Sequence, residues 1–217
     1  MTESLKNISS TFIAICIVTI LPHTGIIPLP FGYVIPIFLF IWFYLKSKNV
    51  KFSSIGLVFK PFSIKPLAHG ALAAILTFGF INYIFFPLLK CIIEFPPTEV
   101  EFYKQIKGNT PFYLFLLIMG WLVGGFYEEI VFHGFIFTQL EKILPQKKTL
   151  FTSFLLTNLI FSLYHFQLGY EGGINAFLAG SIYHALTLWY NRNLWYGIFC
   201  HAIFDSIALT QLYFGYQ

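Results

Sequence analysis

The chain has 217 residues, of which 57% are hydrophobic and 21% aromatic, while Asp, Glu, Lys and Arg together make up only 10%. Ordinary globular proteins carry about 25% charged residues, so this chain has too few charges to cover a water-facing surface. The composition and the mean hydropathy of +0.74 are typical of a polytopic membrane protein. They exclude disordered, collagen-like, disulfide-stapled and nucleic-acid-binding classes.

Apolar stretches along the chain predict how it crosses the bilayer. A hydrocarbon core about 30 Å thick needs about 20 mostly apolar helical residues. Seven spans are predicted, at residues 8–23, 30–45, 66–89, 111–140, 150–166, 172–190 and 194–214. The first is short and contains Pro22, so six or eight crossings remain open. The predicted fold is an all-α polytopic transmembrane helix bundle in which residues 1–217 form one integral-membrane domain.

Basic residues give the orientation, because cytoplasmic loops are enriched in Lys and Arg. With seven spans, ten of them fall on one side: Lys6, Lys46, Lys48, Lys51, Lys60, Lys65, Lys142, Lys147, Lys148 and Arg192. The other side holds Lys90, Lys104 and Lys107. This distribution predicts a cytoplasmic N-terminus.

Several ionisable residues lie inside the last four predicted spans. They are Glu128, Glu129, His133, His165, His184, His201 and Asp205. A charged side chain in lipid is costly unless it is partnered or faces a watery cavity, so each such group indicates a functional site by default. A lone membrane histidine is more often a structural hydrogen bonder, and we interpret His184 in that way.

The spacing of these residues places them on shared helix faces. Three pairs are four residues apart: Glu129 with His133, Phe161 with His165, and His201 with Asp205. At a rise of about 1.5 Å per residue, Glu128, His165 and His201 all lie within roughly 10 Å of the bilayer centre. Asn158 and Ser162 continue a polar stripe from His165. Three helices are therefore predicted to direct two imidazoles and a carboxylate pair into one buried pocket.

The same residues resemble the motifs of a known family. The ordered set Glu-Glu-x-x-x-(Arg), Phe-x-x-x-His and His-x-x-x-(Asn or Asp) on successive hydrophobic helices is similar to that of the CAAX-protease and bacteriocin-processing (CPBP or Abi) intramembrane proteases. The resemblance covers about residues 121–209, which would be the catalytic core. It implies an integral protein of a prokaryotic cytoplasmic membrane.

The resemblance also implies a role for each residue. Glu128 would be the general base that takes a proton from water, and His165 would position that water or shuttle protons. His201 would donate to the developing oxyanion, while Asp205 would fix its tautomer or add a polar contact. Glu129 is counted with the catalytic residues, as a partner to His133 or a backbone-facing support rather than a second base. His133, Phe161 and Asn158 are expected to bind substrate or support the site. At the last position of the first motif, where the family usually has Arg, this chain has His133, which makes fewer contacts. We expect either a difference in substrate anchoring or carboxylate orientation, or a divergent branch of the family.

A metal-dependent mechanism is the alternative chemistry. Two histidines and a glutamate with an open water position describe a catalytic zinc site, for which Glu128, His165 and His201 would be the ligands. The sequence has no His-Glu-x-x-His motif, and the resemblance also permits a glutamate mechanism without metal. We therefore favour a mechanism with no cofactor.

The predicted function is an intramembrane endopeptidase. Its partners would be the lipid bilayer and a peptide or protein substrate in the membrane: a lipidated C-terminal tail, a leader peptide or a sorting segment. The alternative is a non-enzymatic membrane adaptor or bacteriocin-immunity protein. A proton-coupled carrier is disfavoured because the chain has no two-fold internal symmetry.

Overall fold

The computed structural model describes residues 3–59, 63–96, 105–144 and 149–216. Within these ranges the chain is helical and no strand occurs, which confirms the all-α prediction. The helices are α1 (Glu3–Ile20), α2 (Val34–Ser47), α3 (Lys65–Phe80), α4 (Phe86–Lys90), α6 (Thr110–Met119), α7 (Phe137–Ile143), α8 (Thr149–Tyr164), α9 (Gly169–Trp189) and α10 (Leu194–Phe214). Two π-helical segments join them, η3 (Ile81–Phe85) and η4 (Gly120–Ile136), so that α3 continues into α4 and α6 into α7.

The seven predicted spans correspond to seven helical regions of different lengths. Three are long and apolar enough to cross a membrane by themselves: Lys65–Lys90, Thr110–Ile143 and Leu194–Phe214. α8 and α9 pass the same test only together and are bent by 47° at the break between them, which gives up to four spans. The helical regions at Ile8–His23 and Val34–Ser47 are apolar but shorter. Apolar helices of this kind make the chain an integral membrane protein.

Local sequence signals set the ends of the helices around the site. Asn109 caps α6, since its side-chain oxygen accepts a hydrogen bond from the backbone N–H of Phe112 at 3.3 Å. Asn193 caps α10 in the same way through the N–H of Trp195 at 3.2 Å. Gly215 ends α10 in the left-handed conformation that favours glycine.

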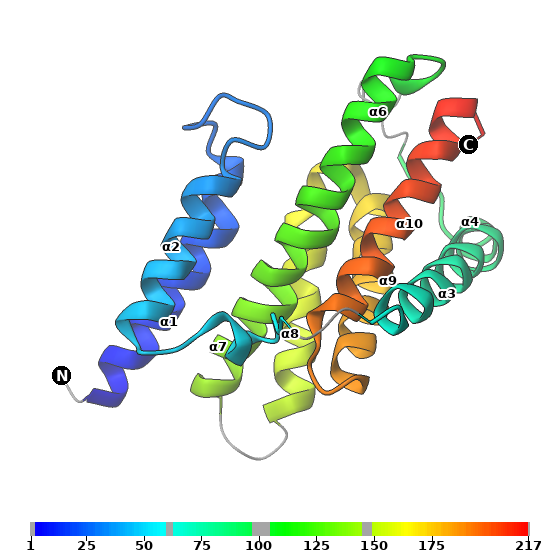
Figure 1. Ribbon diagram of the computed structural model, residues 1–217. Helices are drawn as coiled ribbons and strands as arrows, with labels where there is room; N and C mark the ends of the chain where they lie inside the picture. The colour runs from blue at the N-terminus through cyan, green and yellow to red at the C-terminus, as the bar shows by residue number, and fades with distance from the viewer. Residues whose placement is uncertain (1–2, 60–62, 97–104, 145–148, 217) are drawn as a thin grey trace.

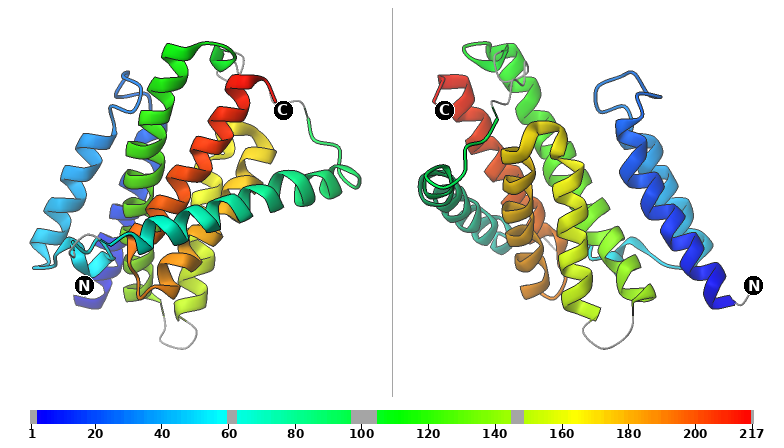
Figure 2. Two further views of the ribbon diagram at one scale, coloured as in Figure 1. Left: turned by 45° about the vertical axis from the view of Figure 1, so that its right-hand side comes forward. Right: turned by 180° about the vertical axis from the view of Figure 1, so that it is seen from behind.

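The α6–η4–α7 region and α10 lie side by side at the centre of the bundle (Figure 1). α8 and α9 pack beside them, and α3 crosses α10 at a steep angle (Figure 2). The α1–α2 pair stands at the other side of η4. This arrangement encloses the middle of η4 between α10 and α8.

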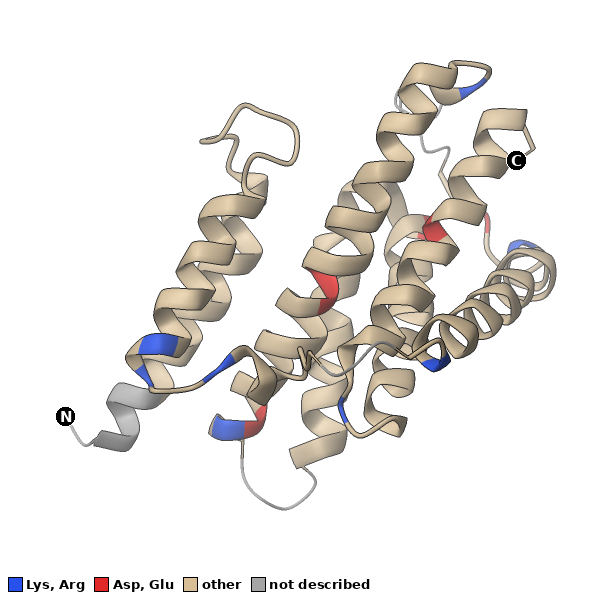
Figure 3. Cartoon of the chain, in the orientation of Figure 1, with Lys and Arg blue, Asp and Glu red and all other residues tan. Residues whose placement is uncertain are grey.

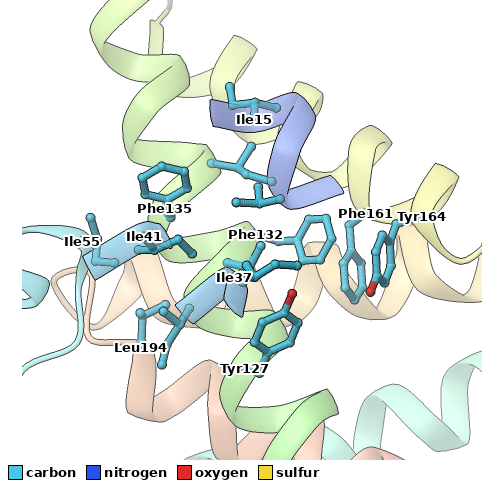
Figure 4. Packing of buried hydrophobic residues seen from close by; sticks show 14 of the residues in the cluster. Ile15, Ile37, Ile41, Ile55, Tyr127, Phe132, Phe135, Phe161, Tyr164 and Leu194 are labelled. Atoms are coloured by element: carbon cyan, nitrogen blue, oxygen red, sulfur yellow. The ribbon is translucent and has the colours of Figure 1, made fainter. Parts of the chain in front are cut away.

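An apolar cluster packs η4 against its neighbours (Figure 4). Phe132 contacts the rings of Phe161 and Tyr164, with ring centroids 5.0 Å apart in each case. Ile37 and Ile41 of α2 are fully buried in the same cluster. The cluster therefore holds η4 in a fixed position relative to α8 and the α1–α2 pair.

Charged residues are distributed unevenly along the bundle. Figure 3 shows most Lys and Arg positions toward the end of the bundle where α2 and α7 finish. Acidic positions also occur halfway along η4 and α10, far from both ends. Four of the basic residues used to predict orientation, Lys60, Lys104, Lys147 and Lys148, lie outside the described residues.

Candidate active site

The two adjacent glutamates lie on η4, in its π-helical stretch. π-helical turns inside helices are rare and occur frequently at functional sites. Glu129 is fully buried and Glu128 is 7% exposed. Close packing brings η4 near α10, because a Cβ atom at Gly125 would stand only 2.7 Å from the Cβ of Ala202. Small residues at this crossing therefore bring the glutamates within reach of the α10 side chains.

Glu129 connects two histidines. Its Oε2 accepts a hydrogen bond from Nδ1 of His133 at 2.7 Å, and its Oε1 accepts one from Nδ1 of His201 at 3.0 Å. Both imidazoles are buried. Because Nδ1 of His201 is hydrogen-bonded to Glu129, Nε2 is the ring nitrogen that remains to contact other groups.

Glu128 lies on the other side of His201. Its Oε2 is 3.4 Å from Nε2 of His165 and 4.0 Å from Nε2 of His201. The structure thus brings together one carboxylate and two imidazoles: Glu128 from η4, His165 from the turn that follows α8, and His201 from α10.

The tautomer of His165 follows from its second ring nitrogen. Nδ1 donates a hydrogen bond to the backbone carbonyl of Phe161 at 2.9 Å, and a carbonyl oxygen can only accept. Nε2 therefore faces Glu128. The Phe161 ring lies against His165, His133 and His201, with centroids 4.4, 5.4 and 5.9 Å apart. Phe161 thus separates the histidines with an apolar surface.

Asp205 lies one helical turn beyond His201. Its Oδ2 is 3.6 Å from His201 Nε2, and its side chain is 30% exposed. The sequence left two roles for Asp205, fixing the tautomer of His201 or adding a polar contact, and in the structure it is Glu129 that is hydrogen-bonded to Nδ1 of His201. Gly124 of η4 leaves room for Asp205, since a Cβ at that position would collide with Oδ2. Asp205 is therefore the member of the group that is most accessible to a substrate.

Asn158 and His184 form a separate polar pair behind the site. Nδ2 of Asn158 donates to the carbonyl of Phe154 at 2.8 Å and to Nδ1 of His184 at 3.1 Å. The His184 ring stacks on His133 with centroids 4.6 Å apart. Asn158 therefore contacts the glutamate group only through these two histidine rings.

Three residues that shape the site carry no signal in the sequence motifs. A Cβ at Gly197 would lie 2.5 Å from Oγ1 of Thr187 and 2.6 Å from Oε2 of Glu129, so both side chains occupy the space above that glycine. The Tyr183 ring stacks on His201 at 4.6 Å. Only their positions in the folded chain reveal them, since isolated glycines, threonines and tyrosines are common in membrane helices.

The zinc alternative requires three side chains placed around a common point. Within the described ranges, no group of three or more His, Cys, Asp and Glu side chains has an arrangement that could hold a metal ion. The mechanism derived below uses only the carboxylates and imidazoles.

Comparison with known proteins gives one match. Residues 110–207 match the family model described as "Type II CAAX prenyl endopeptidase Rce1-like". This stretch runs from the start of α6 into α10 and includes all the candidate site residues described above. The match confirms the resemblance predicted from the three motifs. Searches of curated proteins and of solved structures found no match.

Proposed function

Because residues 110–207 match the family model described as "Type II CAAX prenyl endopeptidase Rce1-like", we propose that the protein is an intramembrane endopeptidase that uses a water activated by Glu128. Its substrate is a membrane-associated peptide: a lipidated C-terminal tail, a leader peptide or a sorting segment. One observation carries the proposal, the convergence of Glu128, His165 and His201 from three helices to within 3.4 and 4.0 Å.

The first step is attack of water on the scissile carbonyl. Glu128 takes a proton from the water, while Nε2 of His165 holds the same water in place. Because the Nδ1 proton of His165 is committed to the Phe161 carbonyl, this ring has a fixed direction. Glu128 and His165 together give the water both a base and an orientation.

The second requirement is a donor for the oxyanion. His201 is suited to this role as an imidazolium, because its Nδ1–H donates to Glu129, whose negative charge compensates the ring, and its Nε2–H is left to face the reacting carbonyl. Asp205 lies beside the same nitrogen and supplies a further polar contact at the entrance. When the tetrahedral intermediate breaks down, the proton held by Glu128 passes to the leaving amine, which balances the reaction.

The proposal includes an orientation of the chain. We place the N-terminus on the cytoplasmic side of a prokaryotic membrane, because the predicted loops on that side carry ten of the thirteen basic residues. The gathering of Lys and Arg positions toward one end of the bundle in Figure 3 supports this orientation.

Glu128→Gln tests the enzymatic function, because glutamine keeps the size of the side chain and removes the base. The purified protein in lipid vesicles is mixed with fluorogenic peptides that carry either a prenylated C-terminal cysteine or an unmodified leader sequence. Cleavage by the native chain and loss of cleavage in Glu128→Gln support the protease. The control is Glu171→Gln, which alters a carboxylate paired with Lys90 at the surface. If Glu128→Gln keeps its full biological activity, the chain is an adaptor or immunity protein.

Metal analysis of the same purified protein tests the cofactor-free mechanism. We expect cleavage to persist after chelation and dialysis. Zinc bound at one atom per chain, and lost together with activity, would overturn this mechanism in favour of the zinc alternative.

A further inference from the structure

A second polar space lies behind the catalytic group. It is a hollow of about 10 Å³ between η4 and α9, near the turn that joins α9 to α10. His133 and Thr187 line its inner part, and Ser54 and Arg192 line the part nearest the surface. Ser54 and Arg192 are exposed, whereas His133 and Thr187 are each only 2% exposed. The hollow therefore extends from the surface of the bundle to a residue that binds Glu129.

Two buried polar atoms at this hollow have no hydrogen-bond partner in the protein: Nε2 of His133 and Oγ1 of Thr187. Since Nδ1 of His133 donates to Glu129, Nε2 of the neutral ring is an acceptor. The Thr187 hydroxyl can donate or accept. The two atoms thus offer complementary positions for one small ligand that both donates and accepts.

The size of the hollow identifies the ligand. A cavity must offer roughly 10–15 Å³ to hold one water, and that water needs two to four polar partners. Thr138 also lines the hollow, and its hydroxyl donates to the carbonyl of Gly134 at 2.7 Å, which leaves oxygen lone pairs free to accept. We propose that the hollow is a water-binding site, in which the bound water donates to His133 Nε2 and accepts from Thr187 Oγ1.

The position of this site gives it a role in the reaction. Thr187 Oγ1 and Glu129 Oε2 both pack against Gly197, so the water site adjoins the carboxylate that binds His201. Hydrogen-bonding groups then run from the water in the hollow through His133 and Glu129 to His201. This route lets protons exchange between the catalytic group and the surface. The role rests on the proposed hydrolysis, whereas the water site does not.

The water site is tested by hydroxyl-radical footprinting of the full chain in detergent, because radiolysis of a bound water labels the side chains that touch it. Phe137 lines the hollow and is 2% exposed. Phe132 is fully buried in the dry apolar cluster and serves as the internal control. We expect Phe137 to be labelled several-fold faster than Phe132. Equal labelling of the two rings would overturn the proposal.

Two substitutions of Thr187 sharpen the test. Thr187→Val keeps the side-chain shape and removes the hydroxyl, so labelling of Phe137 is expected to fall to the level of Phe132. Thr187→Ser keeps the hydroxyl and is expected to keep the labelling. Unchanged labelling in a folded Thr187→Val variant contradicts the site, and if this variant does not fold, the comparison of Phe137 with Phe132 in the native chain decides.

The proton route has a separate readout. In the vesicle cleavage assay, Thr187→Val is expected to lower kcat several-fold at unchanged KM and to change the solvent deuterium isotope effect. Thr187→Ser is expected to keep kcat and the isotope effect at their native values. Unchanged kcat and isotope effect in Thr187→Val would overturn the route but leave the water site in place. A chain that cleaves no peptide contradicts the proposed protease, and the footprinting result still decides the water site.

Discussion

Glu129 Oε1 accepts a hydrogen bond from His201 Nδ1 at 3.0 Å, across 72 positions of sequence. Its second oxygen binds His133 on its own helix. One buried carboxylate therefore fixes two imidazoles, and the direction in which His201 presents Nε2 depends on a residue that lies outside the reacting group. Glu129 is a positioning residue in this arrangement, and Glu128 is the base.

Glu129→Gln is expected to lower kcat/KM by roughly 10- to 100-fold without unfolding the chain. Glutamine has one oxygen and one amino group, so it can accept from only one of the two Nδ1 protons and leaves a buried donor unpaired at a cost of about 1–3 kcal/mol. The vesicle assay measures the loss, with thermal unfolding of the same sample as the test of folding. If Glu129→Gln cleaves at the native rate, Glu129 does not orient His201.

Gly197→Ala is expected to destabilise the chain by about 1–3 kcal/mol, since the added methyl group overlaps Thr187 and Glu129 in a packed interior. Gly79→Ala is the matched control, because a Cβ there meets no atom within 4 Å. Alanine in a helix interior is favoured over glycine by about 0.5–1 kcal/mol, so this control is expected to be neutral or stabilising. Thermal unfolding in detergent measures both variants. Equal unfolding temperatures would contradict the close approach at Gly197.

Asp205→Asn is expected to keep kcat/KM within about tenfold of the native value, whereas Asp205→Ala loses more. The amide preserves a polar contact at 3.6 Å from His201 Nε2, and the 30% exposure of the Asp205 side chain means that water compensates for part of the lost charge. Titration of kcat and KM for both variants separates binding from chemistry. Complete inactivity of Asp205→Asn would instead give its charge an essential role.

His133→Arg would restore the residue usual in the resembling family, and we expect it to destabilise this chain by about 1–3 kcal/mol through overpacking. The His133 ring lies between Phe161 and His184, and the hollow beyond it has only about 10 Å³. His133→Gln, which is smaller, is the control and should unfold at a higher temperature than His133→Arg. A more stable and more active His133→Arg variant would show that the site accommodates the larger cation.

The sequence contained enough information for the helices and for the pairs within them. Apolar stretches predicted the seven helical regions, and the four-residue spacing predicted that Glu129 faces His133. Ionisable residues on three apolar helices also predicted their convergence, because isolated charges in lipid are too costly. These predictions depend on local periodicity and on desolvation, both of which can be evaluated without a structure.

Contacts between helices could not be predicted in the same way. The bond from Glu129 to His201 depends on how closely η4 approaches α10, and this distance is set by Gly125 and Ala202 rather than by either polar residue. The space shared by Thr187 and Glu129 above Gly197 is likewise a tertiary feature. Sequence spacing predicts which residues share a face of a helix, but it does not predict how closely two helices approach each other.

The π-helical winding of η4 has a consequence for how this chain can change during evolution. Each residue of a helix rotates the chain by a fixed angle, about 100° in an α-helix and less in the wider π-helix. An insertion or deletion between Gly120 and Glu128 would therefore turn the two glutamates away from α8 and α10. Point substitutions at the outward-facing positions of this stretch do not change the direction in which the two glutamates point. Its length should therefore be kept more strictly among descendants than the identity of its lipid-facing side chains.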